Sequence, residues 1–142
     1  MSKYISDEDL KIMHRVIKQR FKEINLCMSK GAYFATILLI ASCAECLLYF
    51  MAVKHANTNP KNWSFEALIN WALSYKIISL TSKRHLNKIK NLRNLIHIKL
   101  DLGESEEINL EKTRELLTYF EFVIDEIWIF SKLTTEVANA SN

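Results

Sequence analysis

The sequence predicts a single all-α domain, an up-down bundle of four long helices with one additional short helix. Only two glycines and one proline occur among its 142 residues, whereas a β-rich chain of this length needs many more turn residues. Apolar residues also recur at steps of three and four over long stretches, which is the spacing of one helical face. With 49% hydrophobic and 25% charged residues, the composition is that of a globular domain. We therefore expect residues 1–142 to form one domain, in which the small and polar tail at residues 136–142 is disordered.

The first two helices are predicted from their caps and their apolar patterns. Ser6 is expected to cap the first helix, because acidic residues follow it in the first turn, where the helix dipole favours them. The apolar stripe of this helix consists of Leu10, Met13, Ile17, Phe21, Ile24 and Met28. A break at Gly31 then leads to an almost continuously apolar second helix that ends near His55.

The apolar segment from Gly31 to Val53 is long enough to be weighed as a membrane span, which takes about 20 residues. Glu45 would then lie near the hydrocarbon midplane, at a cost on the order of 3 kcal/mol. Each of the other helices has an apolar stripe that needs a partner, and a helix that is apolar on all sides suits the centre of a bundle. We therefore expect this segment to be the central helix and the protein to have no membrane partner.

The remaining three helices follow a loop that contains asparagine and proline. Ser64 is expected to cap the short third helix, and Thr81 or Ser82 to begin the fourth. An acidic loop leads to the fifth helix, which Asn109 caps. The expected core residues are Phe65, Leu68, Ile69, Ala72 and Leu73 on the third helix, Leu86, Ile89, Leu92 and Ile96 on the fourth, and Leu110, Thr113, Leu117, Phe120, Ile124, Ile127 and Ser131 on the fifth.

Cysteine usage and the N-terminus bear on the compartment. Cys27, Cys43 and Cys46 all lie in apolar helical stretches, without a second cysteine pair that would suit a metal. We expect buried thiols, no metal and no cofactor. The first residues lack the apolar core of a signal peptide, which predicts a cytoplasmic protein.

Charge is distributed unevenly along the chain. Residues 67–100 carry seven basic and no acidic side chains, whereas residues 101–142 carry ten acidic and three basic ones. A concentrated positive stretch attracts polyanions, above all the phosphates of nucleic acids. The alternative is that the acidic last helix packs beside the basic helix and neutralises it, and charge alone favours neither. The candidate RNA-binding residues are Lys83, Arg84, Lys88, Lys90 and Lys99.

Arg93 and His97 are the strongest candidates for chemistry. They are four residues apart and so lie about 40° apart on one helical face. Arg93 also continues the line of Leu86 and Ile89, which predicts an interface and not open solvent. The alternative is that His97 complements the C-terminal helix dipole while Arg93 pairs with an acid of the last helix. The histidines at positions 14, 55 and 85 are expected to be structural.

Two stretches of sequence carry a family resemblance. The run LRNLIH at residues 92–97 resembles the signature of HEPN domains, in which an arginine and a polar residue precede a histidine near a helix end. The run SCAECLL at residues 42–48, after Gly31-Ala32-Tyr33, is similar to the apolar helix with a lone glutamate in many members. The order of the helices agrees as well, so the resemblance covers residues 30–130.

Two features depart from the usual family pattern. Only three residues separate Arg93 from His97, which is shorter than usual and resembles divergent branches in which nuclease activity does not follow from membership. Some members carry a tyrosine two places after the histidine, which a partner nucleotidyltransferase modifies. Here that place holds Lys99, so the role of adenylylation target is not expected.

The resemblance implies a metal-independent endoribonuclease or an RNA-binding module of a toxin–antitoxin or antiphage system, acting as a homodimer with both motifs at the interface. Metal-free cleavage needs a base, an acid and a cation on the transition state. His97, with an ordinary pKa of about 6.5, would transfer protons, and Arg93 would bind phosphate oxygens. Asn94 would orient the phosphate or ribose, and a dimer would supply the second histidine.

Glu45 has a separate expected role. A carboxylate in an apolar helix is costly to bury unless it is paired, and we expect it to hold Arg93 or His97 in place. The alternatives are a structural salt bridge with another cation or exposure at the edge of the bundle.

The sequence thus predicts a HEPN-like bundle that binds single-stranded RNA, with cleavage left open. An antitoxin or a nucleotidyltransferase is the protein partner to consider. The alternative, from another class, is a non-catalytic interaction module such as an antitoxin or a subunit of a defence complex. A third function is nucleotide binding by the same cations.

Overall fold

The computed structural model describes residues 6–101 and 108–140, with residues 97–101 and 138 described by their backbone alone. Within these ranges the chain is helical and has no strand. The helices are α1 (Asp7–Ser29), α2 (Tyr33–His55), α3 (Phe65–Ser74), α4 (Leu80–Asp101) and α5 (Leu110–Ala140). The predicted all-α class, with four long helices and a short one, is confirmed. The segment 102–107 of the predicted acidic loop lies outside the described residues.

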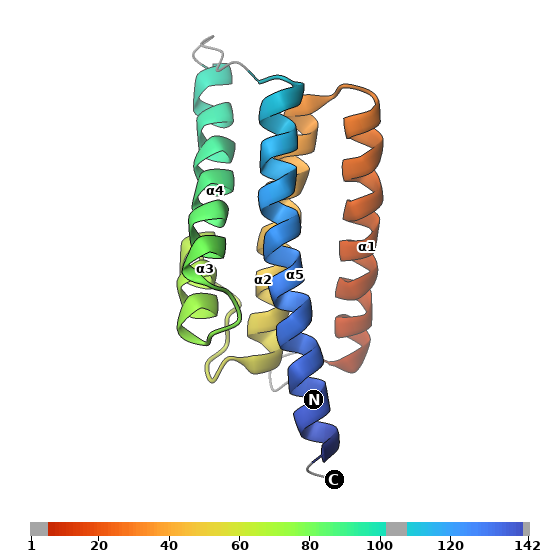
Figure 1. Cartoon of the computed structure of the whole chain (residues 1–142), viewed down its shortest axis with the longest axis vertical. Helices are drawn as coiled ribbons and strands as arrows, with labels where there is room; N and C mark the ends of the chain where they lie inside the picture. Colours follow the sequence, from red (N-terminus) through yellow and green to blue (C-terminus); the bar gives the residue numbers. More distant parts are fainter. Residues whose placement is uncertain (1–5, 102–107, 141–142) are drawn as a thin grey trace.

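The four long helices run alternately up and down, and the short α3 lies beside the lower part of α4 (Figure 1). Helix α2 is central, because its backbone contacts those of α1, α3, α4 and α5. Among the described residues α1 approaches only α2 in this way, and α5 approaches α2 and α4. The bundle therefore forms around α2, with α1 and α4 on opposite flanks.

The central position of α2 accounts for its apolar sequence. By length and composition alone α2 could cross a membrane, but 56% of its most apolar window is buried inside the bundle. Ile37, Ile40 and Leu48 are fully buried. Burial on several sides is what a central helix requires, as the sequence predicted.

The core joins the apolar faces of all five helices. The rings of Phe21 and Phe120 stack with their centres 5.8 Å apart, which links α1 to α5. The predicted stripe of α4 is confirmed, since all its members are buried: Leu86, Ile89, Leu92 and Ile96. The largest fully buried side chains are Phe120, Ile24, Ile37, Ile40, Leu48, Met51, Leu68, Ile69, Leu86, Ile89, Val53 and Val123.

The buried face of α5 differs in part from the predicted seam. Its buried residues are Thr113, Leu116, Phe120, Val123 and Ile127. Leu110, which was expected in the core, is 36% exposed, and Leu117, Ile124 and Ser131 are only partly buried. Positions 113, 120 and 127 belong to both the predicted and the observed face. Leu116 and Val123 flank them on one side of the helix and Leu117 and Ile124 on the other, so periodicity alone does not show which side faces α2. The helix also continues to Ala140, into the tail that was expected to be disordered from residue 136.

Local signals mark most helix starts. The predicted caps at Ser6, Ser64 and Asn109 are confirmed, because each side chain accepts a backbone N–H three residues further on. Gly31 has a φ of 72°, the left-handed conformation that a break between two helices needs. Lys76 takes the same role after α3 with a φ of 61°, which is unfavourable for a residue with a side chain.

The start of α4 is the exception. The sequence placed it at Thr81 or Ser82, but α4 begins at Leu80 and Ser79 is the cap. The Ser79 side chain accepts the backbone N–H of Ser82 over 3.2 Å. Glu126 of α5 in turn accepts the backbone N–H of Ser79 over 3.0 Å and its hydroxyl over 2.8 Å. A residue 47 positions away therefore stabilises this helix start.

Candidate nucleic-acid interface

Arg93 and Glu45 form an ion pair between α4 and α2. Nη1 of Arg93 donates to Oε2 of Glu45 over 2.9 Å, and the guanidinium lies 5.2 Å from the centre of the Phe65 ring. The side chains of Arg93 and Glu45 are 25% and 38% exposed, so the pair lies at the edge of the core. The predicted contact between Glu45 and the helix that carries Arg93 and His97 is confirmed. The alternative pairing of Arg93 with an acid of the last helix is wrong.

The position of Arg93 follows from the helical face that α4 buries. Leu86 and Ile89 are fully buried, and Arg93 follows them on the same face, where α2 and α3 contact α4. Phe65, at the start of α3, is only 3% exposed and supplies an aromatic wall for the guanidinium. The arginine is therefore held by a carboxylate and a ring in a fixed orientation.

The other predicted cations divide between two sides of α4. At about 100° per residue, Lys90 and Lys83 lie within about 80° of Arg93 around the helix axis. Arg84 and Lys88 lie about 140° or more away from it. We call the surface formed by Lys83, Lys90 and Arg93 the Arg93 side of α4. A single phosphate cannot contact all the predicted cations.

The other candidate residues of this part of α4 are Asn94, His97 and Lys99. Asn94 is exposed, one residue past Arg93. The side chains of His97 and Lys99 lie outside the described residues, and the backbone places both in the last part of α4. By helical spacing His97 is about 40° from Arg93 and so belongs to the Arg93 side.

The opposite side of α4 contacts α5 through aromatic residues. The ring of His85 stacks on that of Tyr119 with centres 4.2 Å apart, and the ammonium of Lys88 lies 4.9 Å from the centre of the Tyr119 ring. Burial and the nearby charge of Lys88 lower the pKa of His85. His85 was expected on a polar face; its structural role is supported, but at the contact with α5.

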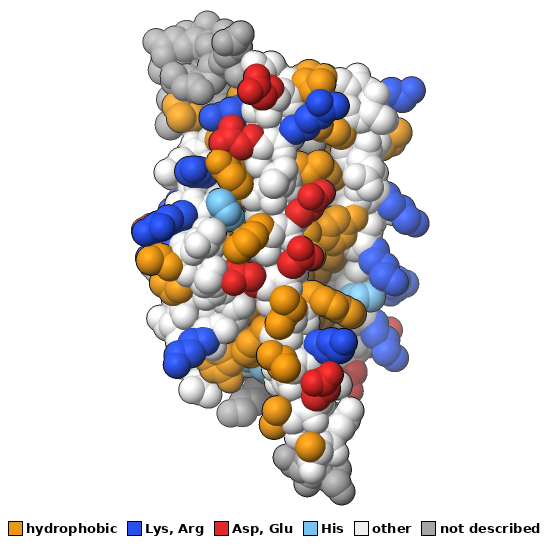
Figure 2. Space-filling model, viewed as in Figure 1, with side chains coloured by type: hydrophobic (Ala, Val, Ile, Leu, Met, Phe, Trp, Pro, Cys, Tyr) orange, Lys and Arg blue, Asp and Glu red, His pale blue; other side chains and the backbone are white. Residues whose placement is uncertain are grey.

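The acidic side chains of α5 lie near the basic side chains of α4, but within the described residues they form no ion pair with them. Figure 2 shows acidic side chains along α5 and basic ones along both flanks, over α4 and α1. The two helices do pack side by side. Within the part of the chain that the structure describes, however, the only ion pair made by an α4 cation joins Arg93 to Glu45 of α2. Acidic side chains that the structure describes therefore form no direct ion pair with Lys83, Arg84, Lys88 or Lys90.

Glu126 is the α5 acid with a defined partner on α4. Its carboxylate accepts hydrogen bonds from Ser79 and from the hydroxyl of Ser82. Burial raises the pKa of Glu126, but the hydrogen bonds from Ser82 and Ser79 outweigh it, and the pKa lies below its ordinary value. This acid caps a helix and is not available to pair with the cations further along α4.

A groove lies next to Glu45 on the side of α2 that faces the loop before α3. Its volume is about 340 Å³, and we call it the Trp63 groove. It is lined by Ser42, Glu45, Cys46, Tyr49, Lys61, Trp63 and Leu68. Its aromatic residues could not be grouped from the sequence, because they come from separate elements. The one indication of an aromatic surface in the sequence was the pair Trp63 and Trp71, on either side of the Ser64 cap.

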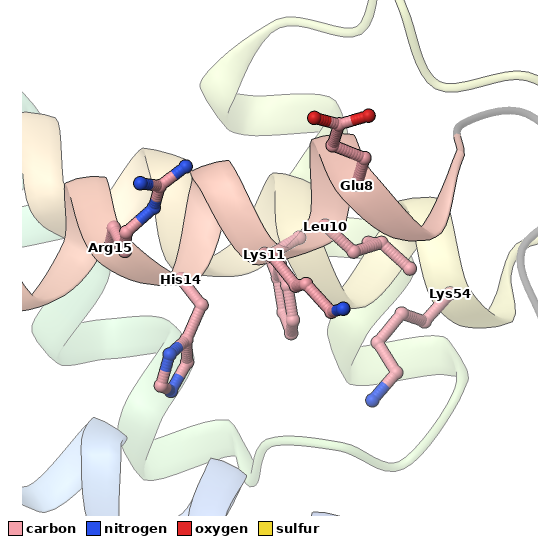
Figure 3. Close-up of a pocket in the computed structure, with 7 residues that line it drawn as sticks. Glu8, Leu10, Lys11, His14, Arg15 and Lys54 are labelled. Carbon is pink, nitrogen blue, oxygen red and sulfur yellow. The ribbon is translucent and has the colours of Figure 1, made fainter.

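A larger open groove, of about 790 Å³, lies between α1 and the end of α2. Lys11, His14 and Lys54 extend in one direction there, while Glu8 and Arg15 lie on the opposite side of α1 (Figure 3). This basic region was not predicted, because residues 1–66 also contain acidic side chains that offset its charge when the segment is counted as a whole. Its signal was the spacing of Lys11 and His14, which are three residues apart and so share a helical face.

Of the three cysteines, all of which were expected to be buried, only one is, whereas Cys27 and Cys46 are partly exposed. Cys43 is fully buried, and burial raises its pKa to about 12. Burial also raises the pKa of Cys46, at the Trp63 groove. Among the described residues no group of three or more histidine, cysteine or acidic side chains is arranged to hold a metal ion. The thiols of Cys43 and Cys46 are poor nucleophiles at neutral pH, because the thiolate is the reactive form and the raised pKa disfavours it.

The fold and this site define a small helical bundle whose basic fourth helix presents an ion-paired arginine next to an aromatic groove. Comparison of the chain with family models, with curated proteins and with solved structures finds no match. The resemblance to HEPN domains therefore rests on the run at residues 92–97, on the context of Glu45 and on the order of the helices.

Proposed function

We propose that this bundle is a HEPN-like RNA-binding domain that takes single-stranded RNA on the Arg93 side of α4. The observation that carries the proposal is the geometry of the Arg93–Glu45 pair. The bond to Glu45 uses one N–H of the guanidinium, which has five donors. With 25% of its side chain exposed, Arg93 retains donors for a ligand. Phosphate oxygens fit such a planar set of donors.

The charge of α4 supports the same ligand. Lys83 and Lys90 are on the Arg93 side and form no ion pair within the described ranges. Lysines and arginines that neutralise phosphates release the counterions condensed on RNA, and this release favours binding. The absence of direct pairs with α5 therefore favours a polyanion as the ligand of this surface.

The proposal extends to metal-independent cleavage through His97. In this extension the histidine transfers the proton of the ribose hydroxyl, Arg93 stabilises the charge on the phosphate, and Asn94 orients the substrate. A homodimer in which two Arg93 sides meet would supply a second histidine as the acid. A cytoplasmic toxin–antitoxin or antiphage system is the setting that we propose for it.

RNA binding is tested by fluorescence anisotropy with a labelled single-stranded RNA at several salt concentrations. Arg93→Ala and Lys90→Ala should weaken binding. Each should also make the slope of log affinity against log salt concentration less steep, by about 0.7 for each phosphate contact that is lost. Lys11→Ala and Lys54→Ala remove the same charge from the opposite flank and should leave both quantities near their wild-type values. Equal losses in both pairs would mean that binding follows net charge, and no binding by the wild-type protein at low salt would contradict the proposal.

The outer face of α5 favours a second candidate function, a non-catalytic interaction module. Ile129, Leu133 and Val137, which follow one another at steps of four along one face of α5, are 57%, 56% and 67% exposed, and this end of α5 extends beyond the other helices (Figure 1). Large exposed apolar side chains that cluster mark interaction surfaces. Sedimentation of wild-type protein and of Ile129→Glu tests this candidate. Self-association lost in the variant would place the contact on α5, and not on the basic helix.

A further inference from the structure

The Trp63 groove combines an apolar wall with a few polar groups. Tyr49, Trp63 and Leu68 supply the wall, and the polar groups are Ser42, Glu45 and Lys61. Its volume of about 340 Å³ is at the lower end of the range for sites that hold small molecules, roughly 300–1,000 Å³. The groove is therefore large enough for one flat ring system and its nearest substituents.

Aromatic rings continue from the groove along the exposed face of α3. The ring centre of Trp63 lies 6.1 Å from that of Trp71, and Trp71 stacks on Tyr75 at 5.3 Å with the planes 24° apart. Tyr75 is 43% exposed. A row of partly exposed rings is a surface on which successive flat groups can stack, whatever their identity.

The charges around the groove select what can enter it. Glu45 lines the groove and also binds Arg93, so a negative carboxylate stands inside while the guanidinium lies behind it on α4. A phosphate in the groove would meet that carboxylate. A neutral ring with amino hydrogens would instead donate to Glu45, while Lys61 in the groove and Arg93 on α4 supply positive charge for the attached phosphates. The occupant that fits is a base with phosphates attached.

We propose that the Trp63 groove binds one base of a single-stranded RNA, by stacking on Trp63 and by hydrogen bonding to Glu45. This inference rests on the proposed RNA-binding function and adds a base subsite to it. Single-stranded RNA is recognised when unstacked bases lie on aromatic side chains and present their edges to polar groups. Adenine, cytosine and guanine have amino groups that can donate to the carboxylate, whereas the only base-edge donor of uracil, N3–H, lies between two carbonyl oxygens that the carboxylate repels, so the groove favours amino-bearing bases over uracil.

Tryptophan fluorescence gives a direct test, because the chain has only three tryptophans. In the variant Trp71→Phe/Trp128→Phe, Trp63 is the sole reporter. Titration with oligoadenylate should quench its emission, whereas an abasic oligonucleotide of equal length and charge should bind more weakly and leave the emission unchanged. Oligouridylate should quench less at equal concentration. This measurement leaves Trp63 intact and does not depend on a variant that removes it.

Affinity measurements provide the second arm. Trp63→Leu should weaken binding of oligoadenylate by roughly 5- to 150-fold, the range for loss of one stacked base, and leave abasic binding unchanged. Trp128→Leu is the matched control, because this tryptophan is 69% exposed and does not line the groove, and it should bind as the wild type does. If wild-type protein binds both oligomers equally and without quenching, the base subsite is refuted while RNA binding stands. If it binds neither, the proposed function fails and the subsite with it.

Discussion

The Glu45–Arg93 pair can be tested by a double-mutant cycle that measures the free energy of unfolding. The variants are Glu45→Gln, Arg93→Gln and the double variant. The pair is short, at 2.9 Å, but its members are 25% and 38% exposed, so water screens their attraction. For such a pair we expect a coupling free energy of about 0.5–1 kcal/mol.

The single variants should differ in a predictable way. Arg93→Gln also loses the contact with the Phe65 ring at 5.2 Å, worth about 0.5–1 kcal/mol, and should cost about 1–2 kcal/mol in total. Glu45→Gln loses only the ion pair and should cost about 0.5–1 kcal/mol. The loss of the ring contact occurs on both arms of the cycle that change Arg93, so it cancels from the coupling.

Urea denaturation followed by circular dichroism supplies the measurement. A loss of 1 kcal/mol corresponds to a shift of about 3–4 °C in Tm for a chain of this size, which gives an independent check. A coupling free energy indistinguishable from zero at low salt would refute the pairing between α2 and α4. A coupling well above 2 kcal/mol would show that the pair is more buried than its exposure indicates.

Four further predictions concern the core, a pH-dependent cap, a strained turn and catalysis. Phe120→Ala should lower the free energy of unfolding by about 3–5 kcal/mol, whereas Trp128→Ala at an exposed position should change it by less than about 0.5 kcal/mol; equal costs in urea denaturation would contradict the burial of Phe120. Because the folded-state pKa of Glu126 is lowered, its carboxylate stabilises the fold above the ordinary pKa and loses that effect as the pH falls through the lowered value; the stability difference between wild type and Glu126→Gln should therefore vanish in acid, and a constant difference would refute the cap. Lys76→Gly should raise the free energy of unfolding by about 1 kcal/mol, because glycine adopts its φ of 61° without strain, and a lower Tm would contradict this. If the bundle cleaves RNA, cleavage should persist in a chelator, leave a cyclic phosphate and disappear in His97→Ala with little loss of binding, and a requirement for added metal would refute the mechanism.

The elements of the fold could be predicted where their signals are local. Ser6, Ser64 and Asn109 cap their helices through a backbone N–H three residues away, so residue type and position suffice. The stripe of α4 was predicted for the same reason, since residues three and four apart share a helical face. The start of α4 was misplaced because the Ser79 cap is supported by Glu126, 47 residues further along the chain.

The candidate site was predicted in part. Arg93 and Glu45 could be singled out because an ionisable residue at the edge of an apolar stripe needs a partner. The Trp63 groove could not, because its walls come from α2, from the loop before α3 and from α3 itself. The two sides of α4 carry different cations, yet only the packing of α2, α3 and α5 around it shows which cations face a common ligand.

The sequence by itself determined the all-α class, the order of the helices, the central place of α2 and the uneven charge. These properties follow from periodicity, composition and hydrogen bonds that span a few residues. Only the tertiary structure decided that Arg93 pairs with Glu45, that His85 stacks on Tyr119 and that α5 turns one of two similar apolar faces inward. Each of these contacts joins residues far apart in the chain. Their geometry depends on the rotation and relative position of whole helices, which local patterns do not specify.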